Sequence, residues 1–436
     1  MLRRLERYFQ FRELRTDWRT EIIAGFTTFV TMAYIIFVNP SILHETGMPL
    51  AAVVAATCLC SAFGSILMGV FARYPIALAP GMGLNAYFTY TVVKGMGVPW
   101  QTALGAVFLS GVAFIILTLI GVRQMIVSAI PYELYSAVAV GIGLFIAFIG
   151  LRNAGIIVAN QATLVTMGNL RNANTLLSLF GLLLIAALLA WGVKAAILIG
   201  ILATTALGAA CGLVPWHPQT YSFADITATA FKLNVASTVQ LGFLEIVFVF
   251  LFVDLFDNVG TLVAVGKKAG LFNEAKEIPR INRILLSDAT ATVVGSLAGT
   301  STVVCYIESA AGVVAGGRSG VTAIVVGLLF AVAMFVAPVV GAIPLAATAP
   351  ALVIVGSLMI AHATEVPWTN PVVAVPAFLT MIAIPLTFSI ANGLAFGFTA
   401  YTILKVARGE GRTVNWLVYL LTALFIARFV YLSSSG

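Results

Sequence analysis

A polar stripe lies within one of the most apolar stretches of the sequence. Residues 244–266 (LEIVFVFLFVDLFDNVGTLVAVG) carry Asp254, Asp257, Asn258 and Thr261. The spacing i, i+3, i+4 and i+7 places all four on one face of a helix. Because a carboxylate in lipid costs about 2.5–3.5 kcal/mol, this face must contact protein or a wet cavity. The stripe can therefore exchange hydrogen bonds with a ligand and, through a carboxyl group, carry a proton.

A second polar group follows a segment that cannot form a regular helix. In residues 74–93 (YPIALAPGMGLNAYFTYTVV), Pro75 and Pro80 prevent helical hydrogen bonding through the first part. The glycines that follow allow open backbone angles, and a helix can begin near Asn85. The pattern predicts an extended segment followed by a half-helix.

Residues 299–317 (GTSTVVCYIESAAGVVAGG) repeat this pattern. Residues 301–306 favour a strand, and Glu308 and Ser309 stand at the start of a short helix. A half-helix directs its free N–H groups at a ligand, and non-helical backbone at membrane depth is tolerated only where it is protein-buried or lines a cavity. Two such segments in corresponding positions indicate a binding site, with simple kinked spans as the alternative.

Together these groups suit a planar ring that carries both hydrogen-bond donors and acceptors. The candidate substrate-binding residues are Asp257, Glu308, Asn85, Asp254, Thr261 and Ser309. Three of them, Asp257, Glu308 and Asp254, are also candidates for proton coupling. Structural alternatives remain: Asp254 as a helix anchor, Asp257 with Glu308 as an internal pair, and Asn85 as an N-cap. Thr27, Thr31 and Tyr34 add a polar face on the first apolar segment. No catalytic or metal-binding residue is expected.

The composition defines the elements that must hold these residues. Of 436 residues, 61% are hydrophobic and 9% are charged, whereas a soluble domain carries roughly 25% charged residues. Residues 319–364 contain no Asp, Glu, Lys or Arg. Such runs predict membrane spans, so the expected fold class is an all-α polytopic membrane protein. Soluble enzymes, secreted disulfide proteins and nucleic-acid binders are excluded, and basic cytoplasmic loops account for the net charge of +7.

Fourteen spans can be placed along the chain. Residues 1–21 are expected to form an amphipathic helix on the inner membrane surface. The predicted spans are 22–39, 50–72, 78–94, 100–121, 133–151, 174–191, 195–213, 240–265, 284–298, 301–316, 320–338, 346–363, 371–389 and 391–406. A further stretch, 415–432, either spans the membrane or lies flat on it.

Basic residues predict the orientation of these spans. With the N-terminus inside, the outer loops hold Lys94, Arg152, Arg171 and Lys232, and most other Lys and Arg fall inside. The expected location is the plasma (inner) membrane, with several spans and a cytoplasmic N-terminus.

The spans divide into two sets of seven. AFGSILMG at 62–69 resembles VVGSLAGT at 293–300, and each precedes an interrupted span. Because seven is odd, the two halves must be inverted relative to one another, which is a transporter architecture. The predicted segments are a cytoplasmic segment 1–21, a first repeat 22–213, an external linker 214–239, a second repeat 240–406 and a C-terminal segment 407–436.

Several motifs resemble the AzgA-like purine permeases of the nucleobase–cation symporter 2 family. They are APGMGLNAYF at 79–88, FVDLFDNVGTL at 252–262 and YIESAAGVVAGGRSG at 306–320. The resemblance runs from about residue 4 to residue 406. It implies a core domain (spans 1–4 and 8–11) that carries substrate against a gate domain (spans 5–7 and 12–14), and a homodimer.

The resemblance also implies roles for individual residues. By motif position, Asp257 hydrogen-bonds the nucleobase and Glu308 holds the opposite edge of the ring. Asp254 is a mark of the AzgA-like branch, and Asn85 matches the asparagine of its GMGLNA motif. Distant uracil carriers have histidine where Thr261 stands, so a histidine-based proton step is not expected at that position. The sequence of the GMGLNAYF motif favours guanine and hypoxanthine over adenine as substrates.

The expected function is therefore proton-coupled import of purine nucleobases by alternating access, with protons as the coupling ion and no cofactor. The bilayer and the purine are the expected partners, and nucleic acid is not. One alternative is an anion carrier or channel on a similar inverted fold, which the acids disfavour. Another is an intramembrane aspartyl enzyme, which needs two facing carboxylates. Asp254 and Asp257 share a helix face and disfavour it, but Asp257 with Glu308 leaves it open.

Overall fold

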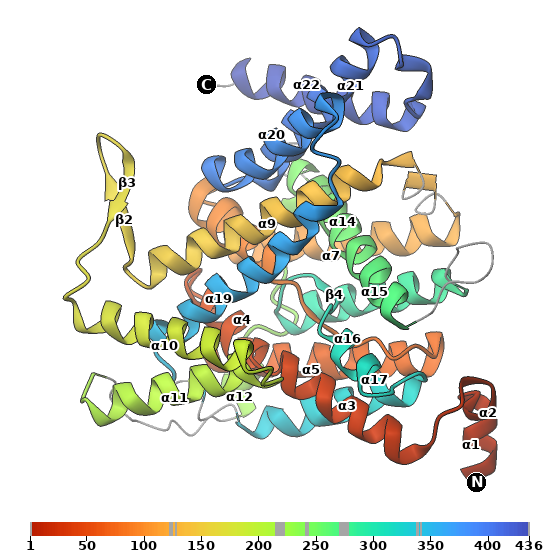
Figure 1. Cartoon of the computed structure of the whole chain (residues 1–436), viewed down its shortest axis with the longest axis vertical. Helices are drawn as coiled ribbons and strands as arrows, with labels where there is room; N and C mark the ends of the chain where they lie inside the picture. Colours follow the sequence, from red (N-terminus) through yellow and green to blue (C-terminus); the bar gives the residue numbers. More distant parts are fainter. Residues whose placement is uncertain are drawn as a thin grey trace.

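The fold is almost entirely helical, as predicted. The computed structural model describes residues 2–121, 125–126, 129–213, 223–239, 244–269, 279–336, 340 and 342–434. The helices cross one another at many angles (Figure 1). Two small antiparallel sheets accompany them. The predicted linker 214–239 and the start of the predicted span 240–265 lie partly outside the described residues.

The elements follow the chain in this order. In the first half they are α1 (Leu2–Tyr8), α2 (Phe11–Leu14), α3 (Trp18–Met32), α4 (Ile35–His44), α5 (Leu50–Leu67), η1 (Met68–Ala72), β1 (Leu78–Pro80), α6 (Met82–Ala86), η2 (Tyr87–Gly95), α7 (Trp100–Leu119), α9 (Tyr132–Asn153), β2 (Ile157–Asn160), β3 (Leu164–Met167), α10 (Ala173–Ala190), α11 (Ala196–Ala210), α12 (Phe223–Ile226) and α13 (Val235–Thr238). In the second half they are α14 (Leu244–Ala269), α15 (Ile281–Ala298), β4 (Val303–Cys305), α16 (Ser309–Val314), α17 (Gly320–Ala333), η4 (Met334–Val336), α19 (Leu345–Met359), η5 (Ile360–Glu365), α20 (Pro371–Thr387), α21 (Ile390–Ala407), η6 (Gly411–Thr413) and α22 (Trp416–Ser434).

The apolar helices make the chain a polytopic membrane protein. Among the described residues, 7 helices are long and apolar enough to cross a membrane, and shorter apolar helices accompany them. A helix satisfies its own backbone hydrogen bonds, which lipid requires. The C-terminal stretch at 415–432 forms α22, which is joined to α21 by a 2.8 Å hydrogen bond between Thr402 and Thr422.

Both interrupted spans contain a strand followed by a short helix. β1 leads into α6, and β4 leads into α16. The two strands pair antiparallel, with Leu78 opposite Cys305 and Pro80 opposite Val303. Two further backbone bonds extend the pairing, from Gly81 N to Thr302 O at 2.9 Å and from Tyr306 N to Ala77 O at 2.9 Å. The two segments thus form one ribbon, although they lie far apart in sequence.

Side chains from neighbouring helices satisfy the outward-facing backbone groups of this ribbon. Ser65 Oγ on α5 accepts from Leu78 N at 3.0 Å and donates to Leu78 O at 3.2 Å. Thr292 Oγ1 on α15 accepts from Val303 N at 3.2 Å and donates to Val303 O at 2.9 Å. Pro80 has no N–H to satisfy. Each edge is therefore held by a hydroxyl that acts as donor and acceptor at once.

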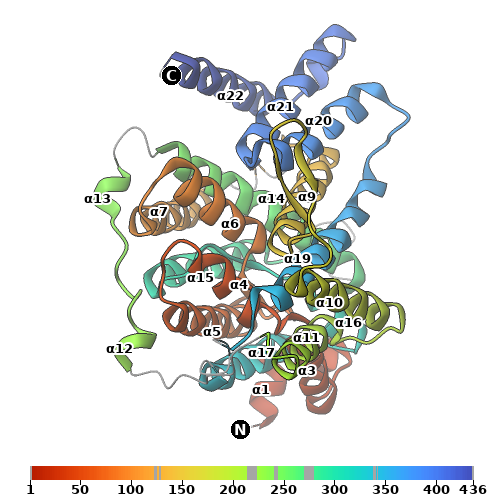
Figure 2. The same cartoon turned by 90° about the vertical axis from the view of Figure 1, so that its left-hand side faces the viewer.

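Two bundles of helices surround the ribbon. The first bundle contains α3, α4, α5, α7, α14, α15 and α17, and the second contains α9, α10, α11, α19, α20 and α21. Figure 2 shows α9, α19 and α20 on one side of the molecule and α3, α5, α15 and α17 on another. α6 and α14 contact both the first bundle and α9, so they lie where the bundles meet.

Polar contacts join the first bundle to the second near the Asn153 end of α9. Asn153 Nδ2 lies 3.4 Å from Glu45 Oε1 and 3.2 Å from the Tyr90 hydroxyl, which itself donates to Glu45 Oε1 at 2.6 Å. Lys94 forms an ion pair with the same carboxylate. Glu45 follows α4, so this cluster links α4 and η2 to α9.

The N-terminal segment differs from the single amphipathic helix predicted on the membrane surface. It forms two short helices, because Gln10 adopts a left-handed backbone with φ of 59° between them. Phe9 and Phe11 are buried in a cluster with Val321 of α17. The Tyr8 hydroxyl donates to Val70 O at 2.7 Å. Phe9 and Phe11 therefore pack against protein, whereas Leu5 of the same segment is exposed.

Glu21 attaches the start of α3 to the start of α17. The sequence places it at a span end, but its side chain is fully buried. Its carboxylate accepts from the backbone N–H groups of Arg318 at 2.9 Å, Ser319 at 3.1 Å and Thr322 at 3.2 Å. An acidic side chain at a helix N-terminus also complements the helix dipole.

Removing either ribbon hydroxyl is expected to destabilise the fold. Ser65→Ala or Thr292→Val leaves a buried N–H and C=O without a partner, at a cost of about 1–3 kcal/mol. Thermal unfolding in detergent should show a lower midpoint for both. Ser110→Ala is the control, because its buried hydroxyl bonds only its own helix at Val107 O. Equal shifts for Ser65→Ala and Ser110→Ala would contradict this account.

Glu21→Gln is expected to lower the unfolding midpoint as well. Every partner of the two Glu21 oxygens is a donor, so the amide NH₂ of glutamine would face N–H groups and lose about 1–3 kcal/mol. Glu13→Gln is the matched control, since Glu13 is exposed and accepts from Gln10. Unfolding midpoints that agree for the two variants would show that Glu21 does not anchor α17.

Candidate functional site

A cavity lies where the ribbon meets α9, α14 and α19. It contains about 720 Å³ of space, part of which is open to solvent. Its lining residues are Tyr34, Gly81, Met82, Gly83, Val138, Ala139, Ile142, Ile146, Phe256, Asp257, Thr261, Val304, Cys305, Tyr306, Ile307, Glu308, Val355, Met359 and His362.

Glu308 is positioned in the cavity by the end of β4 and the start of α16. The Tyr34 hydroxyl donates to Glu308 Oε1 at 2.6 Å, although the two residues are 274 positions apart in sequence. Tyr34 stands at the short break between α3 and α4 and is almost fully buried. This bond fixes one oxygen of a half-buried carboxylate.

Asp257 reaches the cavity from the middle of α14. Its carboxylate has no hydrogen bond with any residue that the structure describes, and it lines the cavity beside Thr261. A Cβ built on Gly81 would lie 3.4 Å from Asp257 Oδ2 and 3.0 Å from Val304 Cγ2. Glycine at position 81 therefore keeps the space in front of the carboxylate open.

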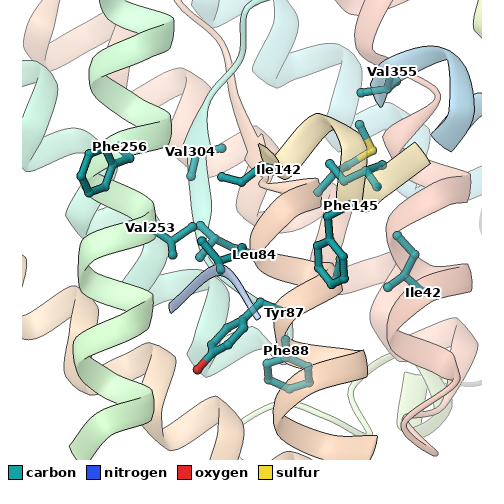
Figure 3. Packing of buried hydrophobic residues seen from close by; sticks show 14 of the residues in the cluster. Ile42, Leu84, Tyr87, Phe88, Ile142, Phe145, Val253, Phe256, Val304 and Val355 are labelled. Carbon is teal, nitrogen blue, oxygen red and sulfur yellow. The ribbon is translucent and has the colours of Figure 1, made fainter. Parts of the chain in front are cut away.

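Apolar side chains of α9, α14, α19 and β4 form much of the remaining lining. Figure 3 labels Phe256, Val304, Ile142 and Val355, which all contribute to it. Gly83 of α6 lies directly against α9, because a Cβ there would be 2.5 Å from Ile142 Cγ2. Apolar walls with a few polar groups are typical of sites for flat organic molecules.

Three of the candidate residues lie outside the cavity lining. Asn85 is fully buried, and its Oδ1 accepts from Ser301 Oγ at 2.5 Å. Ser309 Oγ accepts from Ala77 N at 3.0 Å and so supports the ribbon. Asp254 is buried one turn before Asp257 and contacts Asn258. The cavity thus brings together Asp257, Glu308 and Thr261 of the six candidates.

Asn258 links the polar stripe of α14 to the ribbon. Its Nδ2 donates to Asp254 Oδ1 and to Asp288 Oδ2, each at 2.8 Å. Its Oδ1 accepts from Cys305 N of β4 at 3.0 Å. Asp288 falls near the start of the predicted span 284–298 and was not proposed as a site residue; its position among small and apolar residues was the available signal.

Tyr34 and His362 also line the cavity but were not proposed as site residues. Tyr34 was noted on a polar face with Thr27 and Thr31, which was a usable signal. His362 lies at the end of the predicted span 346–363, where a polar residue is expected at a membrane interface. Nothing in its sequence context distinguishes it from such a residue.

The cavity lining provides two carboxylates, the hydroxyl-bearing residues Tyr34, Thr261 and Tyr306, the His362 imidazole and apolar walls. These groups accept hydrogen bonds, or donate them when protonated. Within the described ranges, no group of three or more His, Cys, Asp or Glu could hold a metal ion. The site therefore suits non-covalent binding of a polar ring.

Comparison with known proteins identifies the family. Residues 19–396 match the family model Xan_ur_permease, described as "Permease family". The chain is 52% identical over 430 residues to a protein of Methanocaldococcus jannaschii whose name assigns no substrate, with 98% of this chain and 99% of that protein covered. It is 47% identical to the guanine/hypoxanthine permease PbuG of Bacillus subtilis (98% and 100% covered) and 44% identical to the adenine permease AdeP of Escherichia coli (99% and 97% covered).

Solved structures share the fold at low sequence identity. The transmembrane domain of the cyanobacterial bicarbonate transporter BicA superposes with a TM-score of 0.65 at 16% identity, covering 85% of this chain and 97% of that domain. The murine anion transporter Slc26a9 in its inward-facing state gives a TM-score of 0.66 at 12% identity, covering 90% and 69%. At these identities the likeness concerns the fold alone.

The match to the family model and the identity to the named permeases show that the chain belongs to the Permease family, in the AzgA-like group of nucleobase–cation symporter 2 proteins that its motifs predicted. It is a transporter rather than an enzyme.

Proposed function

We propose that this chain is a proton-coupled symporter that imports purine nucleobases by alternating access. The observation that carries the proposal is the cavity that holds Glu308, oriented by Tyr34, together with Asp257, which has no partner among the described residues. The names of relatives with high coverage, guanine/hypoxanthine and adenine permeases, support a purine substrate. Identities of 47% and 44% do not separate these substrates, so the preference for guanine and hypoxanthine rests on the GMGLNAYF motif at 81–88.

A purine ring matches the chemistry of the cavity. Its edges carry N–H donors together with nitrogen or carbonyl acceptors, and its faces are apolar. Asp257 and Glu308 are assigned to the ring edges. Phe256, Ile142 and Val355 are assigned to the faces. Thr261 supplies a hydroxyl that can donate or accept.

The proton enters the mechanism through a carboxylate of the cavity. Protonation removes a charge that would otherwise stay unpaired when a neutral base displaces water. One proton moving down a membrane potential supplies about 2.3 kcal/mol per 100 mV. At about 1.4 kcal/mol per decade, this is enough for roughly 50-fold accumulation. Asp257 and Glu308 are the assigned carriers, and Asp254, behind Asp257, is a further candidate.

The architecture proposed with this function has fourteen spans in two inverted seven-span repeats, 22–213 and 240–406. Antiparallel pairing of β1 with β4 supports it, because two inverted segments that meet at mid-membrane run in opposite directions. The first and second bundles correspond to the proposed core and gate domains. A homodimer in the plasma (inner) membrane, with a cytoplasmic N-terminus, completes the proposal.

An anion substrate fits the cavity less well. The solved relatives by fold carry bicarbonate or other anions, but this cavity presents two carboxylates and, among its described lining residues, no Lys or Arg. An anion would meet like charge there.

Neutralising either cavity carboxylate is expected to impair purine uptake. In proteoliposomes, Asp257→Asn and Glu308→Gln should reduce radiolabelled hypoxanthine uptake about tenfold or more, because each removes a charge-assisted hydrogen bond. A protonophore should abolish accumulation by the wild type. Glu13→Gln, on the exposed N-terminal segment, is the control.

Competition with unlabelled guanine, adenine and xanthine in the same assay ranks the substrates. Wild-type rates of hypoxanthine uptake in both Asp257→Asn and Glu308→Gln would refute the site assignment. Purine uptake by the wild type that does not depend on the proton gradient would refute proton coupling.

Tyr34→Phe is expected to raise KM about three- to tenfold, because Glu308 loses the bond that orients it. Tyr74→Phe is the matched control: its hydroxyl bonds Pro279 O, outside the cavity lining. Initial rates across a hypoxanthine series give both constants. A KM that rises equally in the two variants would point to a general packing defect instead.

A further inference from the structure

His362 occupies the cavity from the second bundle. It lies in η5, directly after α19, and its side chain is 16% exposed. The lining on this side also includes Met359 of α19 and Val138 of α9. Asp257 and Glu308 belong instead to α14 and to the start of α16. His362 is thus the imidazole in the described lining, and it faces the cavity from elements that carry neither carboxylate.

Glu365 contacts this histidine. His362 Nδ1 lies 3.4 Å from Glu365 Oε2. The same oxygen accepts from the Tyr132 hydroxyl at 2.9 Å and from Ser136 Oγ at 2.7 Å. Tyr132 and Ser136 are one turn apart at the start of α9. One carboxylate oxygen therefore ties η5 to α9 and contacts the imidazole.

This contact selects the chemistry that the ring presents. A carboxylate beside Nδ1 favours the proton on Nδ1, which leaves the Nε2 lone pair as an acceptor. An acceptor on this side complements the N–H groups of a purine whose other edge meets Asp257 or Glu308. The Tyr132 and Ser136 hydroxyls both donate to the Glu365 oxygen that contacts Nδ1.

We propose that His362 hydrogen-bonds the purine from the second bundle, and that Glu365 is the positioning residue that sets its tautomer. The proposal rests on the proposed function and adds to it a contact from the opposite bundle. A substrate bound in this way joins the two bundles, so its recognition depends on both.

The test compares variants that differ in which ring nitrogen they imitate. Glutamine places its amide near the Nε2 position, and asparagine places it near Nδ1. We expect His362→Gln to keep KM for hypoxanthine within about twofold of wild type. His362→Asn and His362→Leu should each raise KM about three- to tenfold, at little change in maximal rate. Glu365→Gln should raise KM in the same direction, and His362→Asn with Glu365→Gln together should add little further.

His44→Asn is the matched control, since its Nδ1 contacts Met48 O and it lies outside the cavity lining. Equal KM values for His362→Gln and His362→Asn would overturn the inference, even if the leucine variant fails to fold. So would a Glu365→Gln variant that lowers only the unfolding midpoint. If the His362 and Glu365 variants have the KM of the wild type while Asp257→Asn and Glu308→Gln lose uptake, the proposed function is supported and the proposed histidine contact is refuted. If the wild type takes up no purine, both fall.

Discussion

The structure depends on how a short, fully buried ribbon satisfies its backbone hydrogen bonds. In lipid, the N–H and C=O groups at the two edges of a strand pair cannot form hydrogen bonds with water. Here Ser65 and Thr292 occupy one edge each, and Asn258 adds a bond to Cys305 N. Because these three side chains come from α5, α15 and α14, the ribbon fixes the helices around it. The cavity lies at the ends of the strands: Gly81 directly follows β1, and Glu308 comes three residues after the end of β4.

The ribbon determines the positions of the candidate binding residues Glu308 and Asp257. Glu308 follows β4 and precedes α16, while Asp257 is one residue before the asparagine that bonds β4. Tyr34 approaches from the break between α3 and α4 and holds one oxygen of Glu308. A displacement of β4 would therefore move Glu308 directly and would strain the Asn258 bond on α14. The proposed substrate recognition and the stability of the ribbon therefore depend on the same elements.

Much of this arrangement could be predicted from the sequence, and the limits have physical causes. Proline, glycine and β-branched residues marked both interrupted spans, and helical spacing marked the stripe that holds Asp257. Contacts between segments that are far apart in sequence could not be predicted, because the spacing of residues reports only on local structure. Ser309 therefore proved to bond Ala77, and Asp288 proved to be buried. The position of His362 in the cavity lining could not be predicted for the same reason, since it depends on where η5 packs.

The polar cluster around Glu45 has a consequence for how the two bundles separate. Near the cavity, α6 and α9 touch through Gly83 and the aliphatic Ile142, a surface that can slide without exchanging hydrogen bonds. At the far end of α9, separation must release Asn153 from Glu45 and Tyr90. Lys94 and Glu45 are partly exposed, so arriving water can replace the lost bonds. That end can act as a reversible clasp, whose strength depends on salt and on hydration rather than on packing.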